Sequence, residues 1–204
     1  MTASARRREP AVLLAAGAAL LVLSGIAPKD RFTWILEVAP AIVAGVILAA
    51  TYRRFPLTPL AYRLIFLHAC ILMLGGHYTY AEVPLGFRVR DLLGLARNPY
   101  DRLGHFAQGF VPAIVAREIL SRQSPLRGSR WLPFLVVCFC LALSACYEFI
   151  EWWTALATGT AADAFLGTQG DPWDTQWDMF FAFIGAIVAV VTLSGVHDRE
   201  LRKL

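Results

Sequence analysis

Charged residues are scarce in this sequence: they make up 17% of its 204 residues, whereas apolar residues make up 57%. About a quarter of the residues in an average soluble domain are charged, so this composition excludes an ordinary soluble domain. It indicates instead an integral membrane protein, with membrane lipids around it and no nucleic acid as a partner.

Cysteine is also rare, and the four that are present do not follow the CxxC spacing that is typical of thiolate metal centres. All four lie inside apolar runs, where we expect them to be small core residues: Cys70, Cys138, Cys140 and Cys146. Internal repeats and low-complexity tracts are absent as well. We therefore expect residues 1–204 to form a single integral-membrane domain, and no pattern indicates its oligomeric state.

Long apolar runs dominate the chain. At about 1.5 Å per residue of helix, a run of some 20 residues crosses roughly 30 Å of hydrocarbon. Five runs approach this length, near residues 11–27, 33–50, 60–79, 131–153 and 175–195. A sixth segment, 101–120, is polar in its first half and apolar in its second, so hydropathy alone does not decide whether it crosses.

The distribution of lysine and arginine decides the sixth segment, because cytoplasmic loops are enriched in these residues. With six spans, thirteen of the 19 basic residues fall on the face that holds both termini, and six fall on the other. If residues 101–120 did not cross, the basic C-terminus would lie outside. The sequence therefore predicts an all-α, polytopic membrane bundle of about six helices with both termini in the cytoplasm.

Two connections are long for a compact helical domain, and this topology places both on the outer face. Residues 80–100 contain FRVRDLLGLA, which predicts a short interfacial helix, and residues 154–174 are small and polar. The second ends in GDPWD, where Asp171 before Pro172 is typical of a helix N-cap. Loops of this length are often functional.

Polar residues with helical spacing lie where three of the predicted spans meet the outer face. The members of each group share one helix face. The groups are Asp101, His105 and Gln108; Glu148 and Glu151; and Asp174 and Asp178. One ionised carboxylate at the centre of a bilayer costs about 2.5–3.5 kcal/mol on insertion scales, so acids gathered in one leaflet need protons or a cation.

A divalent metal is one solution, because oxygen ligands with one imidazole and no thiolate suit Mg, Mn, Ca or Zn. The predicted ligands are Asp101, His105, Glu148 and Asp178. Glu151 or Asp174 is then free to activate water as a general base. The predicted supporting residues are Gln108, Asp171 and Gln176.

Four arginines lie on the outer face against the charge bias: Arg88, Arg90, Arg97 and Arg102. Guanidinium groups bind phosphate through paired hydrogen bonds, so these side chains are candidates for holding a lipid or polyprenyl substrate. The leading hypothesis is a metal-dependent enzyme acting on a lipid or cell-envelope substrate. A proton- or cation-coupled transporter and a structural polar network without catalysis remain the alternatives.

The histidines outside this region carry less information. His68 and His77 belong to an apolar span and are typical of core or interface positions. His197 lies in the basic C-terminal region and predicts no function. Tryptophans gather at the predicted outer boundary, as in the aromatic belts of membrane proteins.

Three blocks carry a resemblance to a known family: NPYDRLGHFAQGFVPAIVARE, YEFIEWW and GDPWDTQWDMFFAFIGA. They resemble blocks of the YjdF-like family of bacterial inner-membrane proteins, and the match covers most of the chain from the second span onward. This resemblance implies a multi-pass protein of the bacterial inner (plasma) membrane. Because that family is described as being of unknown function, it implies no reaction.

A weaker similarity is to the VanZ-like family. Its pattern of Asp, a basic residue, two positions and His resembles Asp101, Arg102 and His105, and its later acidic residue followed by Gly is similar to Asp178 and Gly185. Where VanZ-like proteins tend to have Asn between those two, this sequence has Ala182. The similarity implies a link with glycopeptide resistance and the cell envelope, without a mechanism.

Overall fold

The computed structural model describes residues 3–204, with the side chains of residues 3–7, 160 and 161 outside the described part. The side chains of Arg6 and Arg7, which enter the topology prediction, therefore lie outside it. Six long helices dominate: α1 (Ala3–Ser24), α2 (Arg31–Thr51), α3 (Pro59–Tyr78), α5 (Tyr100–Gln123), α6 (Trp131–Thr158) and α8 (Asp174–Leu201). The short elements are η1 (Tyr80–Glu82), α4 (Pro84–Leu93), η2 (Gly159–Ala162) and α7 (Asp163–Leu166).

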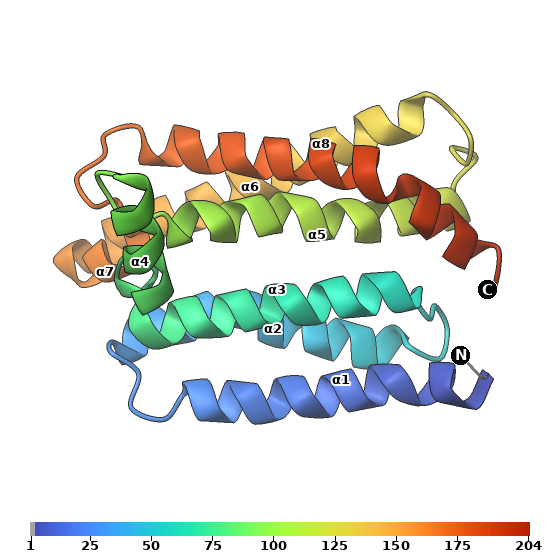
Figure 1. The fold of residues 1–204 in the computed structure, drawn as a ribbon, viewed down its shortest axis with the longest axis horizontal. Coiled ribbons are helices and arrows are strands. Elements are labelled where there is room, and N and C mark those ends of the chain that lie inside the picture. The colour runs from blue at the N-terminus through green and yellow to red at the C-terminus, as the bar shows by residue number, and fades with distance from the viewer. Residues whose placement is uncertain (1–2) are drawn as a thin grey trace.

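The long helices lie side by side along the longest axis of the molecule (Figure 1). Helices α1, α2 and α3 form one half and α5, α6 and α8 form the other, with α3 packed against α5 where the halves meet. Both termini lie at one end, which we call the terminal end. Helices α4 and α7 lie at the opposite end, which we call the loop end.

The described residues form helices and turns and no strand, which confirms the predicted all-α class. By length and composition, four helices are able to cross a membrane, namely α2, α3, α6 and α8. Helix α1 begins with a charged stretch at residues 6–9, and α5 is too polar. Because these two helices fall outside that set, the count of six spans stays a prediction.

Helix α5 is the most enclosed of the long helices, because it packs against α3, α6 and α8 together. Its contact with α8 is close enough for backbone to meet backbone. A Cβ atom on Gly109 would collide with the carbonyl of Ala182, and one on Gly185 would collide with that of Phe106. Small residues allow such close approach between helices in membranes. The contact fixes the polar residues of α5 against those of α8.

The helix starts follow local capping chemistry. Asp30 accepts a hydrogen bond from the backbone N–H of Thr33 at 2.6 Å, and the hydrogen bonds from Thr33 lower the pKa of Asp30. The prediction that Asp171 caps the last helix is wrong by two residues, because α8 begins at Asp174 with Trp173 as its N-cap. The Asp171 carboxylate instead accepts from the N–H of Trp173 at 2.9 Å. It therefore stabilises the turn before the helix, where Trp173 keeps a non-helical backbone.

Candidate functional site

Six buried carboxylates and one histidine gather at the loop end of the helices. We call this set the polar cluster: Glu37, Asp101, His105, Glu148, Glu151, Asp174 and Asp178. Glu37 comes from α2, and the other residues come from the start of α5, the end of α6 and the start of α8. The predicted meeting of the three polar groups is thus present in the structure. Arg97 is the only fully charged cation that an ion pair joins to the cluster in the described part of the chain.

His105 lies at the centre of the cluster. Its Nε2 atom is 3.5 Å from a carboxylate oxygen of Asp101, one turn earlier on α5, and 3.9 Å from one of Asp178 on α8. Its Nδ1 atom faces Gln108 Oε1 at 3.1 Å. Because an amide oxygen only accepts, Nδ1 carries the proton in this contact. Nε2 is then left either to share a second proton with the two aspartates or to offer its lone pair to a cation.

Two overlapping groups of side chains have the spacing of metal ligands. One oxygen or nitrogen atom from each of Asp101, His105 and Asp178 lies within 4.8 Å of the others, and the same holds for His105, Glu148 and Glu151. The first group is on the Nε2 side of the imidazole. Metal-bound histidines usually donate their other ring N–H to a carbonyl or carboxylate, which is the role that Gln108 has towards Nδ1.

Unpaired acceptors remain inside the cluster. Asp178 Oδ1 and Glu148 Oε1 have no hydrogen-bond partner among the described residues, although both atoms are buried. Asp178 as a whole is only 2% exposed. Buried carboxylate oxygens normally accept hydrogen bonds, because a bare one loses the full hydration of the group. These two atoms therefore leave room in the arrangement for a bound proton or cation.

Arg97 closes the cluster at its loop end. Its guanidinium pairs with Asp174, lies 3.3 Å from Asp101 and 3.6 Å from Asp171, and donates to the carbonyl of Gly167 at 3.1 Å. Asp174 is therefore paired with a guanidinium, whereas Glu151 forms no ion pair with an arginine among the described residues. Which of the two activates water stays a prediction.

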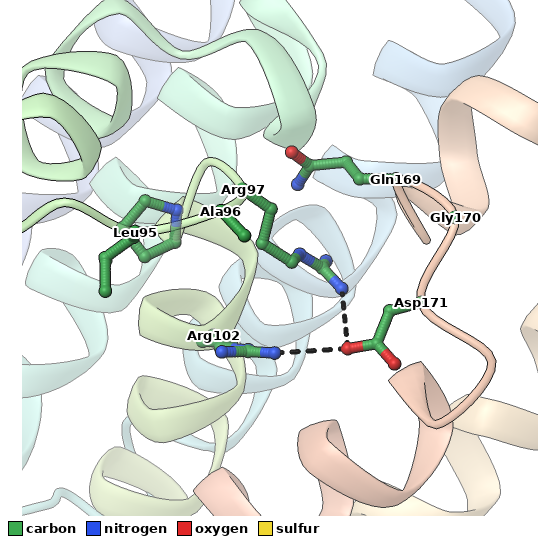
Figure 2. Close-up of a pocket in the computed structure, with 8 residues that line it drawn as sticks. Leu95, Ala96, Arg97, Arg102, Gln169, Gly170 and Asp171 are labelled. Atoms are coloured by element: carbon green, nitrogen blue, oxygen red, sulfur yellow. Dashed lines mark hydrogen bonds and ion pairs between the residues drawn. The ribbon is translucent and has the colours of Figure 1, made fainter.

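The four predicted substrate-binding arginines do not converge. Arg88 is exposed on α4, while Arg90 pairs with its neighbour Asp91 and stacks on Phe87. Arg97 and Arg102 alone among the four line one pocket of about 310 Å³ (Figure 2). Its other walls are formed by Leu95, Ala96, Pro99, Gln169, Gly170 and Asp171. The predicted supporting residue Gln176 is exposed on α8 and lies outside the cluster, because it faces away from Asp174 and Asp178.

Three residues of this region were not predicted from the sequence to belong to the site. Glu37 interacts electrostatically with Asp101 and His105, and it is the only charged residue of the predicted span 33–50. A single charged residue in an otherwise apolar span was the feature of the sequence that could have identified Glu37. Tyr80 is buried beside Glu37, and burial raises its pKa well above the ordinary value, so it stays a neutral donor. The Tyr147 ring packs edge-on to His105, with ring centroids 6.3 Å apart.

A second buried polar network lies near the terminal end, and it corrects the view of His197. That side chain is fully buried and lies between Glu118 and Arg117, with 3.0 Å to each. Glu118 also accepts hydrogen bonds from the backbone and hydroxyl of Thr58, which caps α3, and from Arg122. Both oxygens of the Glu118 carboxylate accept hydrogen bonds. This network therefore joins the two halves and has no unpaired carboxylate oxygen of Glu118 to offer a ligand.

The comparisons with known proteins agree with this architecture. A family model described as "Predicted membrane protein (DUF2238)" matches residues 9–199. The chain is 60% identical over 184 residues to the inner membrane protein YjdF of Escherichia coli (strain K12), covering 90% of this chain and 88% of that protein. No solved structure matches the chain, and the similarity to VanZ-like proteins is not shown. We conclude that this multi-pass inner-membrane protein belongs to the family of predicted membrane proteins DUF2238, to which the match extends over almost its whole length.

Proposed function

We propose that this protein is a divalent-metal-dependent enzyme that acts at the outer leaflet of the inner membrane on a lipid or cell-envelope substrate. The observation that carries the proposal is Asp178 Oδ1, a carboxylate oxygen that is buried and unpaired. Asp178 belongs to the group in which one atom from each residue lies within 4.8 Å of the others, with His105 and Asp101. Without a cation or proton, this oxygen would lose its hydration with nothing in return.

Asp101, His105 Nε2 and Asp178 would hold the metal. Two of these residues are one turn apart on α5, and the third is fixed against them by the close α5–α8 contact. Gln108 would keep the proton on Nδ1, which leaves the Nε2 lone pair free for the metal. Ligands of this kind, two carboxylates and one imidazole, suit Mg, Mn, Ca or Zn.

Two glutamates supply the acid–base chemistry in this proposal. A bound divalent ion lowers the pKa of a coordinated water and polarises an ester or phosphoryl oxygen. Glu151 would take the proton from the attacking water, since its carboxylate lies beside His105 without an arginine partner. Glu148, on the same face of α6 one turn earlier, would take the proton on from Glu151 and release it to water.

The test combines metal analysis with thermal melting of the full chain in detergent. Wild type should hold a divalent ion after purification, and EDTA should lower its melting temperature. At a hundred times the dissociation constant, added metal should restore about 2.7 kcal/mol of stability. Asp178→Asn should lose both the ion and the response to it. Asp91→Asn, at an exposed acid on α4, is the matched control and should behave as wild type.

Indifference of the wild type to EDTA and to all four metals would end the proposal. The enzymatic part has its own readout, which is mass spectrometry of membrane lipids incubated with metal-loaded protein. Glu151→Gln should keep the metal and abolish any change in the lipids. A lipid extract that is unchanged by metal-loaded wild type would contradict catalysis while leaving the metal site in place.

A cation-coupled carrier is the second candidate, and Glu37 is the observation that favours it. This acid belongs to the α1–α3 half, whereas the other acids of the polar cluster belong to the α5–α8 half. A proton or cation shared across this boundary would couple to relative movement of the halves. Proton uptake by proteoliposomes that depends on Glu37 would favour the carrier over the enzyme.

A further inference from the structure

The pocket beside the polar cluster contains two guanidinium groups that point at one oxygen atom. Asp171 Oδ2 lies 3.2 Å from Arg102 and 3.6 Å from Arg97, and Figure 2 shows both contacts converging on that oxygen. Two guanidinium groups around a single oxygen are a typical arrangement for an oxyanion of a phosphate group. In this structure the carboxylate of Asp171 lies where the phosphate oxygen would bind.

The two arginines of the pocket have N–H groups that do not bind Asp171. Arg97 Nε and Arg102 Nε are buried and have no hydrogen-bond partner, and the Arg97 side chain is only 10% exposed. A buried guanidinium N–H without an acceptor costs free energy, so Asp171 does not satisfy all the donors of these two side chains. A phosphate group, with several anionic oxygens, offers more acceptors than one carboxylate.

Aromatic side chains typical of a membrane boundary lie beside Arg102 of the pocket. The Arg102 guanidinium lies over the rings of Trp177 and Phe181, at 5.3 Å and 5.8 Å from their centroids. Trp177 is 43% exposed and Trp173 is 64% exposed, as expected for rings at the headgroup level of a membrane. A ligand that reaches Arg102 from the membrane would therefore place its polar headgroup in the pocket and its tails along α8.

The pocket also adjoins the predicted metal ligands, because Arg97 contacts both Asp171 at the pocket and Asp101 in the polar cluster. A phosphate held here would lie beside the ion that those ligands would bind. Asp171 is held to its own turn by one hydrogen bond to the N–H of Trp173. Its other oxygen is the one that the arginines share.

We infer that Arg97 and Arg102 form an anion subsite for the phosphate group of a membrane-lipid substrate, and that Asp171 occupies this subsite until the substrate displaces it. The link to catalysis rests on the proposed function. The binding itself requires no metal, so it is measured on protein in EDTA. Failure of the metal hypothesis would leave this measurement unaffected.

The experiment measures the affinity of the full chain in detergent for inorganic phosphate by isothermal titration calorimetry. Asp171→Asn removes the competing charge but keeps an oxygen for the N–H of Trp173. It should bind phosphate at least tenfold more tightly than wild type. Asp163→Asn makes the same change at an exposed position of the same connection and should leave affinity unchanged. Adding Arg102→Gln to Asp171→Asn should abolish the gain.

The second arm identifies the source of the phosphate group. Phosphatidic acid in mixed micelles should displace inorganic phosphate from Asp171→Asn, whereas diacylglycerol, which lacks the phosphate, should not. Equal affinity of Asp171→Asn and wild type, or retention of the gain with Arg102→Gln, would overturn the subsite. Phosphate binding that phosphatidic acid fails to displace would overturn the assignment to a lipid.

Discussion

Replacing Glu118 with Ala tests the buried network near the terminal end. The Glu118 carboxylate is fully buried and accepts four kinds of hydrogen bond: from the Thr58 backbone at 3.0 Å, the Thr58 hydroxyl at 2.7 Å, Arg122 at 2.8 Å and His197 at 3.0 Å. The substitution removes this acceptor from all four donors, of which Arg122 keeps a second one in the carbonyl of Pro56. It also leaves the N-terminus of α3 without the contact that joins it to α5.

Removing one partner of a buried, hydrogen-bonded charge pair costs about 3–5 kcal/mol. At about 2–4 °C per kcal/mol for a chain of this size, the melting temperature should fall by roughly 6–20 °C. The assay is thermal unfolding of detergent-solubilised protein followed by circular dichroism. Glu82→Ala is the matched control, because Glu82 forms an exposed pair with Lys29 that is worth about 0–1 kcal/mol.

A melting temperature for Glu118→Ala within about 2 °C of that of Glu82→Ala would refute the reasoning, since the two pairs would then be equivalent. Glu118→Gln should lie between wild type and Glu118→Ala. Its amide keeps one oxygen acceptor but presents a donor to groups that already donate, so the contacts of one oxygen are lost rather than those of both.

Two further predictions concern the α5–α8 contact and the topology. Gly185→Leu should prevent folding or strongly lower the yield of folded protein, because the new side chain would collide with the carbonyl of Phe106. Size-exclusion chromatography in detergent measures this yield, and Gly195→Leu, at an open position, is the control that should elute as wild type. A reporter inserted after Gly167 should be active outside the cytoplasm, because the positive-inside rule assigns the loop end to that side. A cytoplasmic signal would contradict the proposed outer-leaflet site.

Apolar run length and charge bias were sufficient to predict most of the fold. The helix spacing of Asp101 and His105 predicted a shared face, and the acids at the start of the last helix were expected beside it. These predictions depend on the periodicity of a helix and on the alternating direction of successive spans, and both follow from the order of the residues. Residues 101–120 lie within one helix, α5, whereas their crossing of the membrane stays a prediction.

Contacts that depend on how helices pack were not predictable in the same way. Glu37 is brought to the polar cluster by the packing of α2, and nothing in its neighbouring sequence specifies that partner. His197 was judged uninformative because it lies in a basic segment, yet packing buries it completely. The pairing of Arg97 with Asp174 joins residues 77 positions apart. Only tertiary structure could show that Asp174 is paired with Arg97.

The backbone contact between α5 and α8 determines which parts of the molecule are able to move. Where Gly109 meets Ala182 and Gly185 meets Phe106, neither a lipid tail nor a water molecule fits between the two helices. These helices therefore shift together as one rigid body, and the Asp101–His105–Asp178 geometry travels with them unchanged. A rearrangement that admits a ligand therefore takes place outside this contact, in the turn that carries Asp171 or at the boundary between α3 and α5, which the Glu118 carboxylate crosses to reach Thr58.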